Sequence, residues 1–444
     1  MKQYVAIAAA LASIITSLGV LQAAVPTPGA PQDHPIALVG GTVHPVDKPD
    51  IPGGTLLFER GKITAVGPTA TLPPNTEKID VTGKQVYPGL IDANTSLGLT
   101  EIGAVRASND INETGSINPN VKAEVAINPE SEQIPVTRSN GVTLALSAPG
   151  GGVICGTSAL IQLDGWTWED MTVKAPVGMH VKWPRMTTIT AWWMQDSEDK
   201  QKENRDKALK DVRDAFDQAR AYMTAKKGAA PGTPALENDS RWEAMISVLE
   251  GRLPIIVDAD EIQQIEAAVA FAEAEHVKLI IDGGYDAVAC AALLKKDDVP
   301  VLIGGIHRTP QREDDPYDAA YTLPDRLRRA GVRYCITGKG AVFNGDVRNL
   351  PYHAATAAAY GLPKDDALKS ITLYPAQILG ADDRVGSLAV GKDATVIVTD
   401  GDILEIPTHV EMEFIQGRKV DLTDKQKTLW EKYKEKYRRL GIKN

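Results

Sequence analysis

Three ionisable side chains stand at or shortly after the ends of short apolar runs in this chain of 444 residues: Asp258, Asp282 and His307. A carboxyl group in a shielded site takes a raised pKa and can then act as a general base. An imidazole changes its charge close to neutral pH and can serve the same purpose. The three are therefore our candidate catalytic residues.

The centre of the chain alternates short apolar runs with helical segments. The predicted strands are 143–146, 254–257, 279–281, 300–303 and 333–336. This alternation predicts parallel strands joined by helical crossovers. The periodicity fits a barrel and an open sheet equally, and in a barrel the functional groups gather at the carboxyl ends of the strands.

The stretch from Pro88 to Asp92, followed by Ala93 to Ser96, resembles the Pro-Gly-Leu-Ile-Asp-x-His-x-His signature of the amidohydrolase superfamily. In that signature the first barrel strand ends in two histidines, and their spacing of two places both imidazoles on one face, toward a metal ion. Asn94 and Ser96 occupy the two histidine positions in this chain.

Three later motifs extend the resemblance over most of the chain. Residues 386–394 resemble the Gly-Ser-Leu-x-x-Gly-Lys-x-Ala-Asp-Leu segment that closes these proteins, and residues 348–352 and 371–380 resemble the imidazolonepropionase-like branch. The resemblance implies an α/β fold, a (β/α)8 TIM-like barrel with a small β-sandwich built from both chain ends. It also implies a hydrolase for carbon–nitrogen bonds other than peptide bonds, which uses zinc or another divalent metal.

The resemblance implies further metal ligands at the ends of strands five, six and eight. Asp258 stands at the histidine position of strand five, Gly283 at that of strand six, and residues 337–339 bring no carboxylate to strand eight. Because a catalytic zinc needs about three protein ligands, these positions predict no metal site and no cofactor. Lys339 would repel a metal, and we expect it to pair with Asp258 or Asp282 in place of the metal's charge.

The loop 99–118 follows the first strand of the predicted barrel and carries several charged side chains. A loop in that position lines the mouth of a barrel, although the same charges also fit a solvated crossover with internal ion pairs. We predict substrate binding by Asn94, Ser96, Glu101, Arg106 and Lys339. Structural roles are assigned to His34, His44, His180, His276 and His409, and His353 is expected to begin a helix.

Charge and cysteine content exclude some classes of function. The formal net charge of −10 disfavours nucleic acid as a partner. The three cysteines are odd in number and far apart, which predicts packed apolar thiols and no disulfide framework: Cys155, Cys290 and Cys335. The expected partner is a small-molecule ligand or substrate, and a homo-oligomer is compatible with the composition.

Residues 1–24 predict a signal peptide, since Lys2 precedes an apolar stretch that ends in small residues. A membrane anchor is the other interpretation of this segment. We expect an exported protein, periplasmic or extracellular, with no transmembrane anchor after cleavage. The predicted organisation is a tether at 25–34, a composite β-sandwich from 35–87 and 386–422, a barrel at 88–385 with a helical insertion at about 196–227, and a C-terminal helix at 423–444.

Two functions from different classes follow from these residues. The first is a carbon–nitrogen hydrolase, as the resemblance implies, in which other residues replace the missing ligands. The second is a metal-free barrel that binds a small molecule or a protein and catalyses nothing. A third possibility is a metal-independent hydrolase with Asp258 or Asp282 as general base.

Overall fold

The computed structural model describes residues 26–228, 237–339 and 344–442. The predicted signal peptide at 1–24 lies outside these residues. Within the three described ranges, no helix has both the length and the apolar character needed to cross a membrane.

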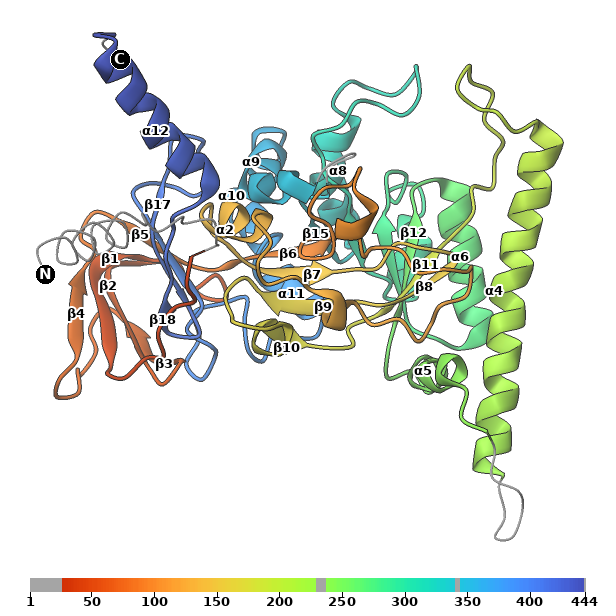
Figure 1. Ribbon diagram of the computed structural model, residues 1–444, viewed down its shortest axis with the longest axis horizontal. Helices are drawn as coiled ribbons and strands as arrows, with labels where there is room; N and C mark the ends of the chain where they lie inside the picture. The colour runs from red at the N-terminus through yellow and green to blue at the C-terminus, as the bar shows by residue number, and fades with distance from the viewer. Residues whose placement is uncertain (1–25, 229–236, 340–343, 443–444) are drawn as a thin grey trace, which may run out of the picture.

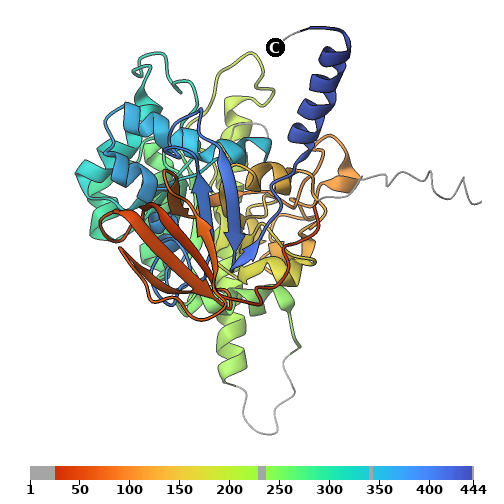
Figure 2. The same cartoon turned by 90° about the vertical axis from the view of Figure 1, so that its left-hand side faces the viewer.

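One eight-stranded sheet, the terminal sheet, is built from both ends of the chain (Figures 1 and 2). Its order is β18-β17-β16-β5-β1-β2-β3, with β4 paired to β1. The strands are β1 (Ile36–Val43), β2 (Ile51–Glu59), β3 (Lys62–Gly67), β4 (Glu77–Asp80), β5 (Gln85–Pro88), β16 (Val396–Thr399), β17 (Val410–Ile415) and β18 (Arg418–Lys419). The two ends meet where β16 pairs antiparallel with β5, and they share one apolar core that includes Phe58 and Phe414.

Two further sheets form the centre of the molecule. The first has the order β10-β9-β7-β6, and the second has the order β15-β14-β13-β12-β11-β8. Their strands are β6 (Leu90–Thr95), β7 (Val142–Ser147), β8 (Ile154–Thr157), β9 (Ala159–Gln162), β10 (Thr172–Lys174), β11 (Met179–Lys182), β12 (Ile255–Ala259), β13 (Leu279–Gly283), β14 (Val301–Ile303) and β15 (Tyr334–Ile336). Strands β11 to β15 are parallel, as are β6 and β7, so their carboxyl ends share a side within each sheet.

The two central sheets enclose a common apolar core. Ile91 and Leu144 come from the first sheet, and Ile256, Ile280 and Leu302 come from the second. All of these side chains are almost completely buried. Ala376 of α11 (Leu373–Ile378) belongs to the same core. Cavities lie at both ends of these strands, and the one at the carboxyl ends is lined by the charged residues predicted from the sequence.

Helices pack around the outside of the central sheets (Figure 1). They are α2 (Gln133–Arg138), α3 (Trp168–Met171), α4 (Glu198–Lys227), α5 (Ser240–Leu249), α6 (Ile262–Glu275), α7 (Ala291–Lys296), α8 (Ala319–Ala330), α9 (Leu350–Ala359) and α10 (Lys364–Lys369). The last helix, α12 (Lys425–Arg439), projects from the body and buries none of its side chains. The long helix α4 buries Val212, Phe216 and Ala219, and the ring of Phe216 packs edge-on against Phe271 of α6 with centroids 5.0 Å apart. This apolar stripe explains why a helix with so many charges stays attached to the body.

A buried carboxylate joins the terminal sheet to the centre. Asp164, just after β9, accepts a hydrogen bond from Nη1 of Arg138 at 3.0 Å and one from Nε of Arg418 in β18 at 3.3 Å. The side chains of Arg138 and Asp164 are 4% and 1% exposed, so neither charge can be satisfied by water. Arg138 also donates to the carbonyl oxygen of Asp421 at 2.9 Å, which fixes the segment that leads into α12.

Substituting Asp164→Ala is expected to lower the free energy of unfolding by about 3–5 kcal/mol, because it leaves the buried guanidinium of Arg138 without its charge partner. Urea denaturation of the variant and the parent measures this effect. Glu203→Gln is the matched control, since it removes one charge from the exposed pair Lys200–Glu203 on α4 and should leave the midpoint unchanged. Equal midpoints for the parent and Asp164→Ala would contradict the expectation.

Candidate functional site

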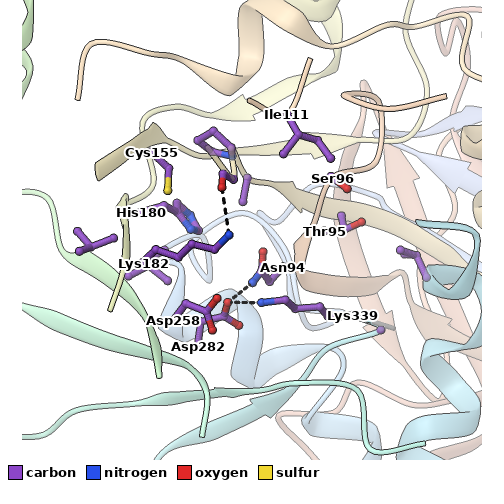
Figure 3. Close-up of a pocket in the computed structure, with 17 residues that line it drawn as sticks. Asn94, Thr95, Ser96, Ile111, Cys155, His180, Lys182, Asp258, Asp282 and Lys339 are labelled. Atoms are coloured by element: carbon purple, nitrogen blue, oxygen red, sulfur yellow. Dashed lines mark hydrogen bonds and ion pairs between the residues drawn. The ribbon is translucent and has the colours of Figure 1, made fainter. Parts of the chain in front are cut away.

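The parallel register aligns three charged residues at the carboxyl ends of neighbouring strands (Figure 3). Lys182 of β11 is paired in register with Asp258 of β12, which is paired in turn with Asp282 of β13. Neighbouring strands lie about 4.8 Å apart, so the three side chains share one small region. A cation and two carboxylates therefore line the same edge of the sheet.

The carboxylate of Asp282 is shared by two donors from distant parts of the chain. Its Oδ2 accepts a hydrogen bond from Nδ2 of Asn94 at 2.6 Å and lies 2.7 Å from Nζ of Lys339. The Asp282 side chain is only 4% exposed, whereas that of Lys339 is 40% exposed. This ion pair is the one expected for Lys339, and it ties the end of β13 to the end of β6 and to the segment after β15.

Asp92 forms a second buried junction between β6 and the segment after β15. Its Oδ2 accepts a hydrogen bond from the backbone N–H of Gly338 at 3.1 Å, and its Oδ1 accepts one from the N–H of Asn94 at 3.0 Å. A Cβ at position 338 would lie 2.7 Å from Asp92 Oδ2, so only glycine allows this approach. Burial raises the pKa of Asp92 to about 7, although both backbone hydrogen bonds lower it.

The protonation of the neighbouring groups follows from burial and from the nearby charges. Burial raises the pKa of Asp258, and the cation of Lys339 opposes that rise. For Lys339, burial lowers the pKa, but the charges of Asp282 and Asp258 outweigh it and raise the pKa above its ordinary value. Burial lowers the pKa of His180 to about 4, so its imidazole is neutral at pH 7. Lys339 is therefore a permanent cation in this site.

A cavity of about 340 Å³ lies at the strand ends, beside Asp258, Asp282 and Lys339 (Figure 3). Ligand pockets for small molecules have volumes of roughly 300–1,000 Å³, so the cavity suits a small ligand. The polar and charged side chains that line it are Asn94, Thr95, Ser96, Cys155, His180, Lys182, Asp258, Asp282 and Lys339. Burial raises the pKa of the Cys155 thiol to about 11, which keeps it protonated and unreactive at neutral pH.

The structure brings five of the residues predicted from the sequence into this cavity and places three others outside its lining. Those that line it are Asn94, Ser96, Asp258, Asp282 and Lys339. Glu101 accepts hydrogen bonds from the Ser131 hydroxyl at 2.5 Å and from the backbone N–H of Glu132 at 3.2 Å, so it fixes the start of α2. Exposed Arg106 donates to the carbonyl oxygen of Asn109 at 2.7 Å within its own loop.

His307 is held by α9 and does not line the cavity. Its ring stacks on that of His353 with centroids 4.1 Å apart, and its Nε2 lies 2.8 Å from Oγ1 of Thr356. His353 accepts a hydrogen bond at Nδ1 from the backbone N–H of Ile306 at 3.1 Å. The two imidazoles thus anchor the loop after β14 to α9, which is the physical reason that His307 does not reach the cavity.

Five polar residues of the site were not selected from the sequence: Asp92, Thr95, Cys155, His180 and Lys182. The sequence predicts a structural role for His180, whereas the structure places it on β11 in the lining of the cavity. Residues 179–182 form a strand of four residues, too short to stand out as an apolar run. The alternation of His180 and Lys182 with apolar Met179 and Val181 was the available signal.

The residues present do not fit a catalytic metal. Oδ2 of Asp282 is already engaged by an amide and an ammonium, and the ammonium would repel a divalent cation. Gly283 has φ +103°, and a Cβ there would lie 2.8 Å from Oδ1 of Asp260, so the position is unsuited to a side-chain ligand. In residues 26–228, 237–339 and 344–442, no three His, Cys, Asp or Glu side chains are grouped so that they could hold a metal ion.

Comparisons with known proteins relate the chain to one group of hydrolases. A family model described as "Amidohydrolase family" matches residues 313–424. The amidohydrolase tasK of Hapsidospora irregularis is 23% identical over 399 residues, which cover 82% of this chain but only 39% of that protein. An imidazolonepropionase of Symbiobacterium thermophilum is 25% identical over 405 residues, which cover 83% of this chain and 87% of that enzyme.

A solved structure gives the same relation at the level of the fold. The crystal structure of an amidohydrolase from Thermotoga maritima MSB8 is 28% identical, with a TM-score of 0.78. The match covers 87% of this chain and 99% of that one. With the family match, this similarity assigns a TIM-barrel fold of mixed α/β content.

Asp92 is expected to make stability depend on pH. Its folded-state pKa of about 7 lies above the ordinary value of 3.8, so between about pH 4 and pH 7 the folded protein keeps a proton that the unfolded chain has lost. The contribution of Asp92 to the free energy of unfolding should therefore fall as pH rises, by at most about 1.4 kcal/mol per pH unit, and level off above pH 7.

Urea denaturation of the parent and of Asp92→Asn from pH 4 to pH 8 measures this contribution as the difference between the two proteins. Asp206→Asn, at an exposed position on α4, serves as the control and should give a difference that stays constant with pH. A parent-minus-variant difference that is constant, or that increases with pH, would contradict the raised pKa of Asp92.

Proposed function

Because this chain belongs to the amidohydrolase superfamily, in its imidazolonepropionase-like branch, we propose that it binds a small polar molecule in the cavity without metal-assisted hydrolysis. The observation that carries the proposal is the ion pair of Lys339 with Asp282 at 2.7 Å. It gives the cavity a permanent positive charge, which in this proposal takes the role of the charge of a metal. A metal-bound water, the usual nucleophile of such hydrolases, then has no place to form.

The groups around the cavity favour a ligand that carries both a hydrogen-bond donor and a negative or carbonyl oxygen. Nζ of Lys182 has a carbonyl oxygen, that of Gly150, at 3.5 Å, so most of its donor capacity is available. Two buried atoms of lining residues, Oδ1 of Asp282 and Nε2 of His180, make no hydrogen bond within the protein. Unpaired buried polar atoms cost free energy, and a ligand with amide or amine N–H groups beside them offsets that cost.

Metal-independent hydrolysis is the second candidate function. The raised pKa of Asp258, caused by burial, is the property expected of a general base that works near neutral pH. The similarity to hydrolases also favours hydrolysis as a function. In this scheme Asp258 takes a proton from water, and Lys339 and Lys182 face the oxygen that becomes negative. The binding function stands first because it requires only the cavity and its polar lining, whereas hydrolysis also requires a partner that orients Asp258.

We also propose how the sheets are closed and where the protein is located. The two central sheets are taken to form one (β/α)8 barrel, which the pairing of β6 with the segment after β15 supports. The terminal sheet is taken to curl into a small β-sandwich around the apolar core with Phe58 and Phe414. The apolar, small-residue composition of 1–24 supports export to the periplasm or the medium.

Elemental analysis of the purified protein, expressed with zinc, manganese and iron in the medium, tests whether a metal binds. We expect less than about 0.1 equivalent of each metal per chain, because Lys339 and Asn94 already contact the carboxylate of Asp282. The Lys339→Met variant is measured in parallel and should still lack metal, since Gly283 brings no ligand. One equivalent of a metal in the parent would overturn the proposal and restore a metallohydrolase.

Ligand binding is tested by thermal shift and calorimetry against a panel of cyclic amides and N-acyl amino acids. We expect at least one compound to raise the melting temperature of the parent, and Asp258→Asn together with His180→Phe to reduce its affinity about tenfold or more through the loss of polar contacts. The control is Glu273→Gln on the surface of α6, which should bind as the parent does. Chromatography of each bound compound after incubation separates the two functions, because intact compound supports binding alone and cleaved compound supports hydrolysis.

A further inference from the structure

The last helix, α12 (Lys425–Arg439), stands away from the rest of the molecule in both views (Figures 1 and 2). Its first turn is fixed, because Asp424 is buried and its Oδ1 accepts hydrogen bonds from the N–H groups of Gln426 and Lys427 at 2.8 and 2.9 Å. Beyond that turn, none of its side chains is buried. An isolated helix of about 15 residues is only marginally stable in water, so a further surface is needed to stabilise α12.

One side of α12 is apolar and aromatic. Its members are Leu429, Trp430, Tyr433, Tyr437 and Leu440, and each is between 41% and 63% exposed. Their spacing of three and four residues places them along one stripe of a helix with 3.6 residues per turn. We name these five residues the α12 stripe. An exposed stripe of this kind marks an interaction surface.

Positive charge follows the edges of the α12 stripe. At 100° per residue, Lys425, Lys432 and Lys436 lie along one edge, and Lys427 and Lys434 lie along the other. The ammonium of Lys434 lies 4.3 Å from the centroid of the Trp430 ring. The two glutamates of the helix, Glu431 and Glu435, lie on the far side, where Glu435 pairs with Arg438 and Arg439.

The charge of α12 is opposite to that of the rest of the chain. The helix has seven Lys and Arg residues and two Glu residues, which gives it a formal charge of +5, while the whole chain carries −10. The remainder therefore carries −15. A cationic stripe of this kind is complementary to an anionic surface.

The kinds of residue in α12 distinguish a lipid surface from a protein surface. Interfaces between proteins are enriched in arginine and depleted in lysine, whereas five of the seven cations of α12 are lysines and both arginines are paired with Glu435. Lysine stems extend along apolar surface and keep the ammonium in water, and Trp and Tyr concentrate at the boundary between headgroups and acyl chains. A basic face combined with an aromatic and Leu face is the pattern of helices that lie flat on membranes.

We propose that α12 is a membrane-surface helix that places the α12 stripe at the headgroup boundary of an anionic lipid bilayer. The lysines along its edges lie close to the lipid phosphates, and the fixed first turn keeps the body of the protein beside the membrane. The helix does not span the bilayer, because its charges surround the stripe on both sides. This proposal is independent of the ligand in the cavity.

Vesicle sedimentation with the full chain tests the proposal. The probes are vesicles of phosphatidylcholine alone and vesicles of phosphatidylcholine mixed with phosphatidylglycerol. We expect preferential binding to the anionic vesicles, weakened when NaCl is raised from roughly 0.05 to 0.5 M because salt screens the lysines. The triple variant Trp430→Ser, Tyr433→Ser and Tyr437→Ser should lower the partition coefficient about tenfold or more.

Two further variants separate the apolar and electrostatic contributions. Lys432→Gln, Lys434→Gln and Lys436→Gln together should abolish the preference for anionic vesicles. Arg438→Gln with Arg439→Gln serves as the control and should retain most of the preference, because Glu435 already pairs with both guanidinium groups. All variants carry the same N-terminal residues, so the differences report on α12 alone. They should fold as the parent does, because no side chain of α12 is buried, and circular dichroism and melting temperature check this.

Two outcomes would overturn the proposal. In the first, the parent and the triple serine variant bind both kinds of vesicle equally. In the second, vesicles are not bound and light scattering shows that the triple serine variant converts an oligomer into a monomer, which would identify a second copy of the chain as the occupant of the stripe.

Discussion

A carboxylate that is withdrawn from water must be neutralised where it lies, and Asp282 meets this requirement with groups from two distant segments. The ammonium of Lys339 and the amide of Asn94 both engage Oδ2, at 2.7 and 2.6 Å. Asp92 adds a parallel constraint through the N–H of Gly338 at 3.1 Å. These contacts hold the first strand of the centre, the strand β13 and the segment after β15 in one arrangement, and the shape of the cavity depends on that arrangement.

The same contacts support the proposal of a cavity that works without a catalytic metal. Asn94 and Lys339 both engage the carboxylate of Asp282, and Gly283 next to it brings no side chain. Replacing one of these residues leaves the other two in place. A side chain at position 283 would be strained, because the backbone there has φ +103°. The fold fixes where a site can be, and the residues at the strand ends decide what it does.

Elsewhere in the molecule, charges are used in two contrasting ways. Asp164 and Arg138 are buried and paired, and they lock the terminal sheet onto the centre. The lysines of α12 are exposed and flank an aromatic stripe that no described residue covers. The first arrangement serves the stability of one molecule, and the second is suited to contact with another surface.

Local pattern in the sequence identified β7 and β12 to β15, because an apolar run and the residue after it are neighbours in the chain, but it missed the short strand β11. It therefore identified Asp258 and Asp282. The family resemblance added the departures at Asn94 and Ser96 from the signature and the ion pair expected of Lys339. Only the tertiary structure decided that His180 and Lys182 join them and that Glu101, Arg106 and His307 do not. The direction of a side chain at a strand end depends on the register with its neighbours and on loops such as that of His307, which stacking on His353 holds against α9, and these contacts join residues far apart in the chain.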